Sequence, residues 1–124
     1  MRVETLLEKN LVTLMEHETS YLMVFSTVPN ESTAEYLAKA LLENKLAACI
    51  NIIRQLTSVY IWEGQLVTDT ECLLLIKTLQ ENYTELAACL RQIHPYSLPE
   101  IIALPITQGN QDYLDWLKNT VKKP

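Results

Sequence analysis

The sequence predicts an α+β fold in which helices cover one face of an antiparallel sheet. Two runs rich in β-branched and aromatic residues flank Glu63-Gly64, and an X-Gly pair between such runs is typical of a β-hairpin. Stretches with helical spacing of apolar residues follow the first, third and fourth of four apolar runs, at 21–25, 46–53, 72–76 and 101–106. The 124-residue chain is long enough for one domain with a substantial core.

The hairpin has a defined register if Glu63-Gly64 forms its loop. The residues that then lie opposite each other are Trp62 and Gln65, Tyr60 and Val67, and Ser58 and Asp69. Ser58, Tyr60 and Trp62 share one face of the hairpin, because side chains alternate along a strand. The returning strand is apolar throughout 72–76, so both of its faces need cover.

Upstream of the hairpin, the chain is predicted to form a strand, a helix and a second strand. Pro29-Asn30 ends the first strand, and Ser32-x-x-Glu35 is a capping box at the start of the helix. The apolar stripe of this helix consists of Ala34, Leu37, Ala38, Leu41 and Leu42. Asn44 closes the helix, and Arg54-Gln55 is expected to be a bulge or bend between the strand at 46–53 and the hairpin.

Downstream of the hairpin, Asn82-x-x-Glu85 is a second capping box, and His94-Pro95 ends the helix that follows it. Pro105 places the last apolar run at a sheet edge or a strand end. Gly109-Asn110 begins a final helix, whose apolar side consists of Tyr113, Trp116, Leu117 and Val121.

The order of these elements is β-α-β-β-α-β plus a C-terminal helix, which is the ferredoxin-like split βαβ arrangement. Two crossover helices cover only one face of such a sheet, and the third helix is too short to cover the other. The apolar runs therefore predict burial of the second face against other copies of the chain. We assign this domain to residues 21–124, and residues 1–20 form an N-terminal extension that is either a short amphipathic helix or disordered.

The composition narrows the function. The net charge of −5 and the absence of a Lys/Arg-rich stretch argue against nucleic acid as a partner. No apolar run has the length of a membrane span, and no signal-peptide pattern opens the chain. Cys49, Cys72 and Cys89 lack Cys-x-x-Cys spacing and fit reduced, buried thiols of a cytoplasmic protein. Two glycines are too few for a phosphate-binding loop.

Lys77 is the first candidate binding residue, because it ends an apolar strand and lysine is rarely buried unpaired. Glu71 lies on the same strand face but about 20 Å away at the rise of a strand, so the two cannot pair within that strand. One interpretation is a lysine that reaches solvent or forms an ion pair between subunits. The other is a cleft between subunits in which Lys77, Tyr96 and Glu100 hold a small anionic or zwitterionic ligand, with Glu71 nearby.

The large aromatic residues have a different predicted role. Tyr60 and Trp62 are expected to anchor an interface with another subunit rather than to form a stacking platform for a ligand. Trp116 is assigned to the interface as well. The histidine, lysine and glutamate candidates form no recognisable set of nucleophile, base and orienting group, so the sequence predicts a protein that is not an enzyme.

Several motifs occur in a fixed order between about Tyr21 and Leu117. They are Thr27-x-Pro29, Leu46-Ala47-Ala48-Cys49, Ser58-x-Tyr60-x-Trp62-x-Gly64, Glu71, Ile76-Lys77-Thr78, His94-Pro95-Tyr96, Pro99-Glu100 and Tyr113-Leu114-x-Trp116. With these motifs the chain resembles the CutA family of divalent-cation tolerance proteins. The resemblance implies a compact homotrimer of ferredoxin-like subunits, similar to PII-type signal-transduction proteins, and a link to copper and other divalent metals.

The resemblance also raises the question of a metal site. Enterobacterial members associated with copper have a cysteine after the first strand and two adjacent histidines before the Pro-Tyr pair. In this chain those positions hold Ser26, Ile93 and His94, so His94 is the remaining candidate ligand. The alternative is that His94 is a helix-end residue that holds a backbone carbonyl. Binding of copper or another divalent cation is therefore expected to be weak.

Together, the motifs predict a trimeric binding or regulatory protein that responds to divalent metal ions. The alternative is a PII-like sensor that binds a small molecule in the cleft between subunits and has no physiological role with metals.

Overall fold

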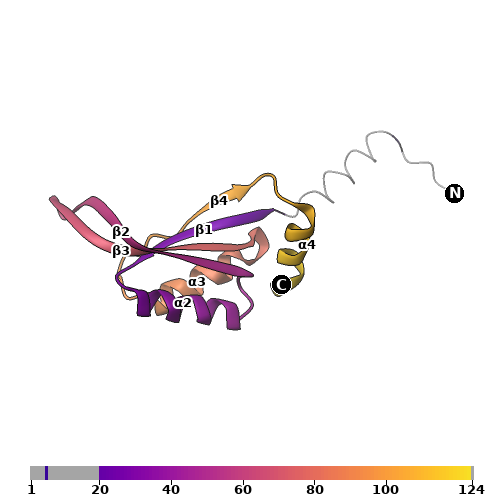
Figure 1. Ribbon diagram of the computed structural model, residues 1–124, viewed down its shortest axis with the longest axis horizontal. Coiled ribbons are helices and arrows are strands. Elements are labelled where there is room, and N and C mark those ends of the chain that lie inside the picture. The colour runs from indigo at the N-terminus through magenta and orange to yellow at the C-terminus, as the bar shows by residue number, and fades with distance from the viewer. Residues whose placement is uncertain (1–4, 6–19, 124) are drawn as a thin grey trace.

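The computed structural model describes residue 5 and residues 20–123, so nearly all of the predicted extension at 1–20 lies outside the described part. The elements, in chain order, are β1 (Tyr21–Val28), α2 (Glu31–Glu43), β2 (Cys49–Trp62), β3 (Gln65–Leu79), a 3₁₀ turn (Gln80–Asn82), α3 (Tyr83–Ile93), β4 (Ile102–Ile106) and α4 (Gln111–Thr120). Figure 1 shows the sheet above α2 and α3, with the β2–β3 hairpin extending beyond it.

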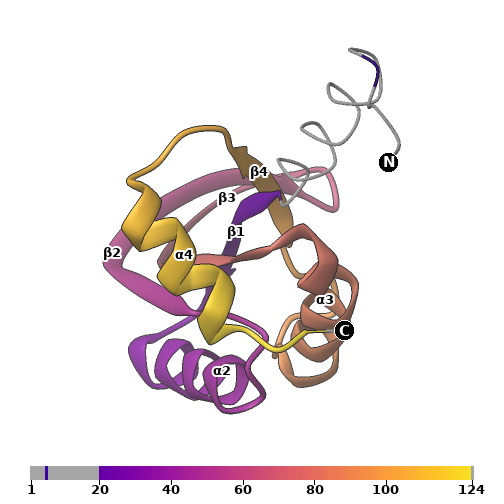
Figure 2. The same cartoon turned by 90° about the vertical axis from the view of Figure 1, so that its right-hand side faces the viewer.

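The four strands form one sheet in the order β2-β3-β1-β4, and the three pairings are antiparallel. This order confirms the predicted ferredoxin-like α+β fold. Figure 2 shows α2 and α3 side by side on one face of the sheet, and α4 at the end of the sheet. β4 is an edge strand, as Pro105 predicted. A proline is tolerated there because an edge strand does not need every backbone N–H for the hydrogen bonds of the sheet.

The core lies between the sheet and the two crossover helices. Alternate residues of β1 and β3 point toward the helices, and those of β3 include Leu74 and Ile76, which are fully buried. Leu37 and Leu41 on α2 and Leu86 and Leu90 on α3 meet them from the other side, and all are fully buried. The predicted stripe of α2 therefore forms part of the helix side of the core, except for Leu42, which is 38 % exposed.

The opposite face of the sheet is apolar and only partly covered. Phe25 and Leu75 lie opposite each other on this face and are half-buried. Ile102 and Leu104 on β4 are 49 % and 50 % exposed. α4 covers only one end, where Leu117 and Val121 pack with residues that close the sheet, namely Tyr21, Ala48 and Leu79. The expected incomplete cover of the second face is thus present.

Two predicted capping boxes were wrong in detail. Asn30, not Ser32, caps α2: its side-chain oxygen accepts a hydrogen bond from the Thr33 amide at 2.9 Å. Asn82 stands at the start of α3 but makes no side-chain cap: its backbone is already helical, and its amide group donates to the Lys122 carbonyl at 2.8 Å. Asn82 therefore ties the chain after α4 to the body of the protein.

The second strand also begins later than predicted. β2 starts at Cys49, because Leu46 and Ala47 form a buried turn after Asn44, which ends α2 as expected. The Leu46 carbonyl accepts a hydrogen bond of 2.6 Å from the buried Thr78 hydroxyl. A satisfied carbonyl in this position allows the turn to be buried.

The hairpin has the predicted register, with Trp62 opposite Gln65. Glu63 and Gly64 both have positive φ, 50° and 78°, as a two-residue type I′ loop requires. The register shifts between Ile53 and Leu56, and Gln55 has a φ of 53°, so the expected bulge is present. Beyond the bulge, residues 56–71 pair only with each other and form an arm that leaves the sheet (Figure 1).

Candidate functional site

A groove lies at the base of the arm, with a cavity volume of about 720 Å³. One side consists of the arm, and the other is the connection between α3 and β4. The lining residues are Thr27, Ser58, Val59, Tyr60, Trp62, Asp69, Glu71, Pro95, Tyr96, Ser97, Leu98 and Glu100. A volume of this size is typical of small-molecule sites.

The arm gives the groove its polar and aromatic side chains through simple alternation. Ser58 lies opposite Asp69 and Tyr60 opposite Val67, so the predicted shared face of Ser58, Tyr60 and Trp62 is the face that lines the groove. The Tyr60 hydroxyl donates a hydrogen bond to Asp69 across the two strands. This bond raises the pKa of Tyr60.

A chain of hydrogen bonds fixes the opposite wall. His94 ends α3, and its Nδ1 accepts a hydrogen bond of 3.1 Å from the Tyr96 amide. The other ring nitrogen, Nε2, therefore carries the proton and donates to the Thr27 carbonyl at 3.0 Å. The Tyr96 hydroxyl in turn donates to Oε2 of Glu71 at 2.7 Å. His94 thus connects β1 to the loop that places Tyr96 on Glu71.

The electrostatics of this wall favour neutral His94 and neutral Tyr96. Burial lowers the pKa of His94, and its hydrogen bond to Thr27 and the charge of Glu71 only partly offset that effect. Burial, followed by the hydrogen bond to Glu71, raises the pKa of Tyr96 well above that of an exposed tyrosine. Tyr96 is therefore a stable hydrogen-bond donor to a carboxylate that is itself only 6 % exposed.

The structure brings together three of the four predicted ligand-binding residues. Glu71, Tyr96 and Glu100 line the groove, but Lys77 does not. Lys77 lies further along β3, where its Nζ is 3.9 Å from Cys49 Sγ and 5.6 Å from the centre of the Tyr113 ring. Within one chain, Lys77 therefore cannot share a ligand with the groove residues.

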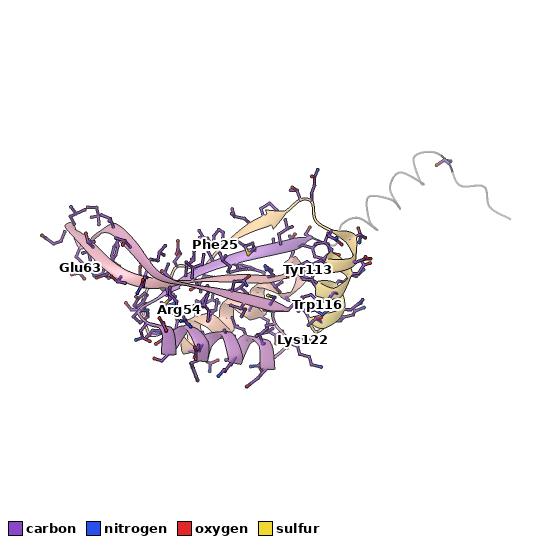
Figure 3. The ribbon with its side chains drawn as sticks, in the orientation of Figure 1. Phe25, Arg54, Glu63, Tyr113, Trp116 and Lys122 are labelled. Carbon is purple, nitrogen blue, oxygen red and sulfur yellow. The ribbon has the colours of Figure 1, made fainter. Side chains whose placement is uncertain are left out.

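The predicted interface residues lie at opposite ends of the molecule. Tyr60 and Trp62 are on the arm, 38 % and 44 % exposed, whereas Trp116 is on α4 and 45 % exposed. In Figure 3, Glu63 marks the tip of the arm, far from Tyr113 and Trp116 at the other end. The ring centres of Tyr113 and Trp116 are 5.5 Å apart.

Copper does not fit the residues that the structure describes. No group of three or more His, Cys, Asp or Glu side chains among them could hold a metal ion. Both nitrogens of His94 are engaged with the backbone, which confirms the alternative that it holds a carbonyl. Ser26 lies within β1, which runs to Val28 just before Pro29, and its side chain is fully buried. Direct coordination by His94 would require the loss of one of its hydrogen bonds.

Sequence reasoning missed part of the groove. The hairpin register predicts Asp69 opposite Ser58 and therefore on the face of Tyr60 and Trp62, but it did not identify Asp69 as a groove residue. Ser97 and Leu98 had no signal of their own, since their position depends on how the loop after α3 returns to β4. Thr27 belongs to the Thr27-x-Pro29 motif, but nothing in that motif indicated a place in the groove.

With the fold and the groove defined, the chain can be compared with known proteins. The sequence profile described as CutA1 divalent ion tolerance protein matches residues 22–120. The chain belongs to this family. It is 51 % identical over 96 residues to the divalent-cation tolerance protein CutA of Thermus thermophilus, which covers 77 % of this chain and 93 % of that protein. It is 44 % identical over 98 residues to human protein CutA, which covers 79 % of this chain.

Solved CutA structures have the same fold. The divalent cation tolerance protein of Thermus thermophilus aligns with a TM-score of 0.80 at 48 % identity, over 82 % of this chain and 99 % of that one. CutA1 of Oryza sativa aligns with a TM-score of 0.83 at 43 % identity, over 86 % and 97 % of the two chains. The matched region covers 64 % of the Xenopus laevis homolog and 55 % of the human protein.

The names of these relatives describe tolerance of divalent cations, and none is the name of an enzyme. Two plant relatives are named as chloroplastic. In the part of the chain that the structure describes, no helix is long and apolar enough to cross a membrane.

Proposed function

We propose that this CutA protein acts in divalent-cation tolerance as a cytoplasmic regulatory protein, and that it senses a small ligand rather than storing metal. The observation that supports the proposal is the groove at the base of the arm. It combines a volume suited to a small molecule with three carboxylates and three aromatic rings. The hydroxyls of Tyr60 and Tyr96 already donate to carboxylates, and both ring nitrogens of His94 are engaged.

These engaged groups favour binding over catalysis. A general base needs a free acceptor within hydrogen-bond reach of the proton it removes. Ser58 and Ser97 are the serines of the groove, and His94 has no free nitrogen to activate either of them. We therefore assign the groove a sensing role.

The location of the groove suggests how a ligand would act. One wall is the arm and the other is the loop from His94 to Glu100, so a bound molecule would touch both. A ligand can shift the arm only if it binds one arm position better than another. Contacts to both walls would provide that difference.

The proposed assembly is a homotrimer, as the family resemblance implies. A surface at one end of a chain that meets a different surface at the other end can close into a ring. The arm offers Val59, Ile61 and Leu66, which are 62 %, 66 % and 73 % exposed, and the far end offers Trp116 and Tyr113. Docking of an arm on the next chain would place the groove beside the contact between subunits.

Direct copper binding is the second part of the proposal and is expected to be weak. Soft copper prefers thiolate and imidazole ligands, whereas the groove provides carboxylates and phenols. Calorimetry under reducing conditions tests this expectation. Tight stoichiometric binding that survives His94→Ala with the cysteines blocked would contradict it.

Growth of a deletion strain tests the function itself. Loss of the gene in its own host should lower the concentration of Cu²⁺, Zn²⁺ or Co²⁺ that stops growth, and the wild-type gene should restore tolerance. Tyr96→Phe should restore less, because it removes the hydrogen bond to Glu71. Glu35→Gln, on the exposed face of α2, is the control and should restore tolerance fully. An unchanged metal dose response in the deletion strain would refute the proposal.

A further inference from the structure

The groove carries a net negative charge without a basic side chain of its own. Its lining includes Asp69, Glu71 and Glu100 and no lysine, arginine or histidine. The nearby His94 has a lowered pKa and stays neutral at pH 7. Walls of low polarity concentrate such a field, so the groove attracts cations and repels anions.

Glu71 is the most informative of these carboxylates. It is only 6 % exposed, and among the described residues its hydrogen-bond donor is the neutral hydroxyl of Tyr96. The ion pairs of the described chain are Arg54 with Glu31 and Lys122 with Glu85, so none of them neutralises Glu71. A glutamate this buried is normally paired, because an uncompensated buried charge is costly.

The shape and the walls favour an organic cation over a metal ion. The cavity of about 720 Å³ is far larger than an ion needs, and no cluster of metal ligands is present among the described residues. Tyr60, Trp62 and Tyr96 contribute aromatic rings, and Leu98 adds an apolar side chain. Aromatic faces attract ammonium groups, and the attraction grows where water is displaced.

We infer that the groove binds a small organic molecule with an ammonium group and an apolar body. The ammonium group pairs with Glu71, while Asp69 and Glu100 add to the attraction and the aromatic rings hold the apolar part. The inference rests on the proposed sensing function and names the class of its ligand. It departs from the anionic or zwitterionic ligand considered from sequence, because Lys77 of the same chain lies outside the groove.

Three compounds of matched shape separate charge from size. We would titrate the full-length protein at pH 7.5 and low salt with 2-phenylethylammonium, 2-phenylethanol and 3-phenylpropionate. Calorimetry should detect binding of the ammonium compound and no measurable binding of the alcohol or the carboxylate. Equal affinity for the alcohol and the ammonium compound would overturn the inference, as would tighter binding of the carboxylate.

Three glutamate-to-glutamine variants show which carboxylate binds the ammonium group. Glu71→Gln keeps an acceptor for Tyr96 and removes the charge, so it should weaken ammonium binding about tenfold or more. Glu100→Gln changes an exposed side chain, so it should leave folding unchanged and weaken binding severalfold. Glu35→Gln removes the same charge from the surface of α2 and should leave binding unchanged. Equal losses in all three variants would assign the effect to net charge and refute the site.

Two other possible occupants of the groove, a lysine of a second copy and a divalent metal, predict different titration results. If Lys77 of a second copy fills the groove, no probe binds to wild type, and Lys77→Met opens the groove to the ammonium compound. If the groove holds divalent metals, Cu²⁺ or Zn²⁺ binds with a dependence on Glu71 and the ammonium compound does not. Either result overturns the inference. A metal-sensitive deletion strain would still support the tolerance function, so the two proposals fail separately.

Discussion

β2 and β3 each pass through two regions with opposite burial. In the body, where β3 pairs with both β1 and β2, Leu74 and Ile76 are fully buried. In the arm, residues 56–71, the same strands pair only with each other, and Ile61 and Leu66 are 66 % and 73 % exposed. Apolar side chains in the body stabilise the folded chain because they are buried. Those in the arm contribute little to the stability of a single chain because they stay exposed. We expect exposed apolar surface of this kind to contact another molecule.

A matched pair of leucine truncations is the strongest way to break this comparison. Leu74→Ala should lower the free energy of unfolding by about 2–5 kcal/mol, because it leaves a cavity in the core. Leu66→Ala should lower it only through assembly, so its effect should depend on protein concentration. Urea unfolding at two concentrations a hundredfold apart measures both. A concentration-independent loss of similar size at Leu66 would show that the arm is part of the core.

Truncation of the arm tryptophan gives the next largest effect. Trp62→Ala should weaken assembly by about 2–4 kcal/mol if the side chain anchors a subunit contact. The mutant should lower thermal stability, make the oligomer dissociate on dilution, and keep its helices. Circular dichroism and light scattering of the same samples check this. A Trp62→Ala oligomer as stable as wild type would assign Trp62 to the groove alone.

Two tyrosine-to-phenylalanine changes compare the buried wall of the groove with the arm. Tyr96→Phe removes the 2.7 Å hydrogen bond to Glu71 and should cost about 1.5–3 kcal/mol, since the carboxylate is buried and charged. Tyr60→Phe removes the hydrogen bond to Asp69 at an exposed site and should have no measurable effect on unfolding. Equal losses in the two variants would contradict the assignment of Glu71 as the buried charge.

The pH dependence of stability gives the smallest effect. Burial lowers the pKa of His94 below its ordinary value of 6.5, so the unfolded chain binds the proton more readily. Stability should be complete above pH 6.5 and decline as the pH falls from there toward the folded pKa. Protonation would also break the hydrogen bond from the Tyr96 amide. Urea midpoints at pH 7.5, 6.5 and 5.5 should fall in wild type and change less in His94→Gln.

Much of the fold follows from residue pattern alone. Glu63-Gly64 between β-branched runs predicted the loop and its register, because only a few turn types fit a two-residue hairpin. Pro105 predicted the edge strand for a similar local reason. The capping boxes failed for two different reasons. Asn30, two residues before Ser32, caps α2 in its place, and Asn82 already has a helical backbone and directs its amide group to a carbonyl 40 residues away.

The candidate site was predicted less completely. Glu71, Tyr96 and Glu100 line one groove, and their role in ligand binding stays a prediction. Lys77 was grouped with them, although six residues of strand separate it from Glu71. The groove itself depends on the path of the loop from His94 to β4, and no local pattern in the sequence encodes that path.

The mass of the protein in solution tests the central claim most directly. If the exposed arm is a contact between copies, light scattering at micromolar concentration should give three times the 14.2 kDa mass of one chain. Replacement of the exposed Ile61 by aspartate should lower that mass without unfolding the chain. A wild-type protein that stays at 14.2 kDa would contradict the claim and leave the arm as a ligand-facing element alone.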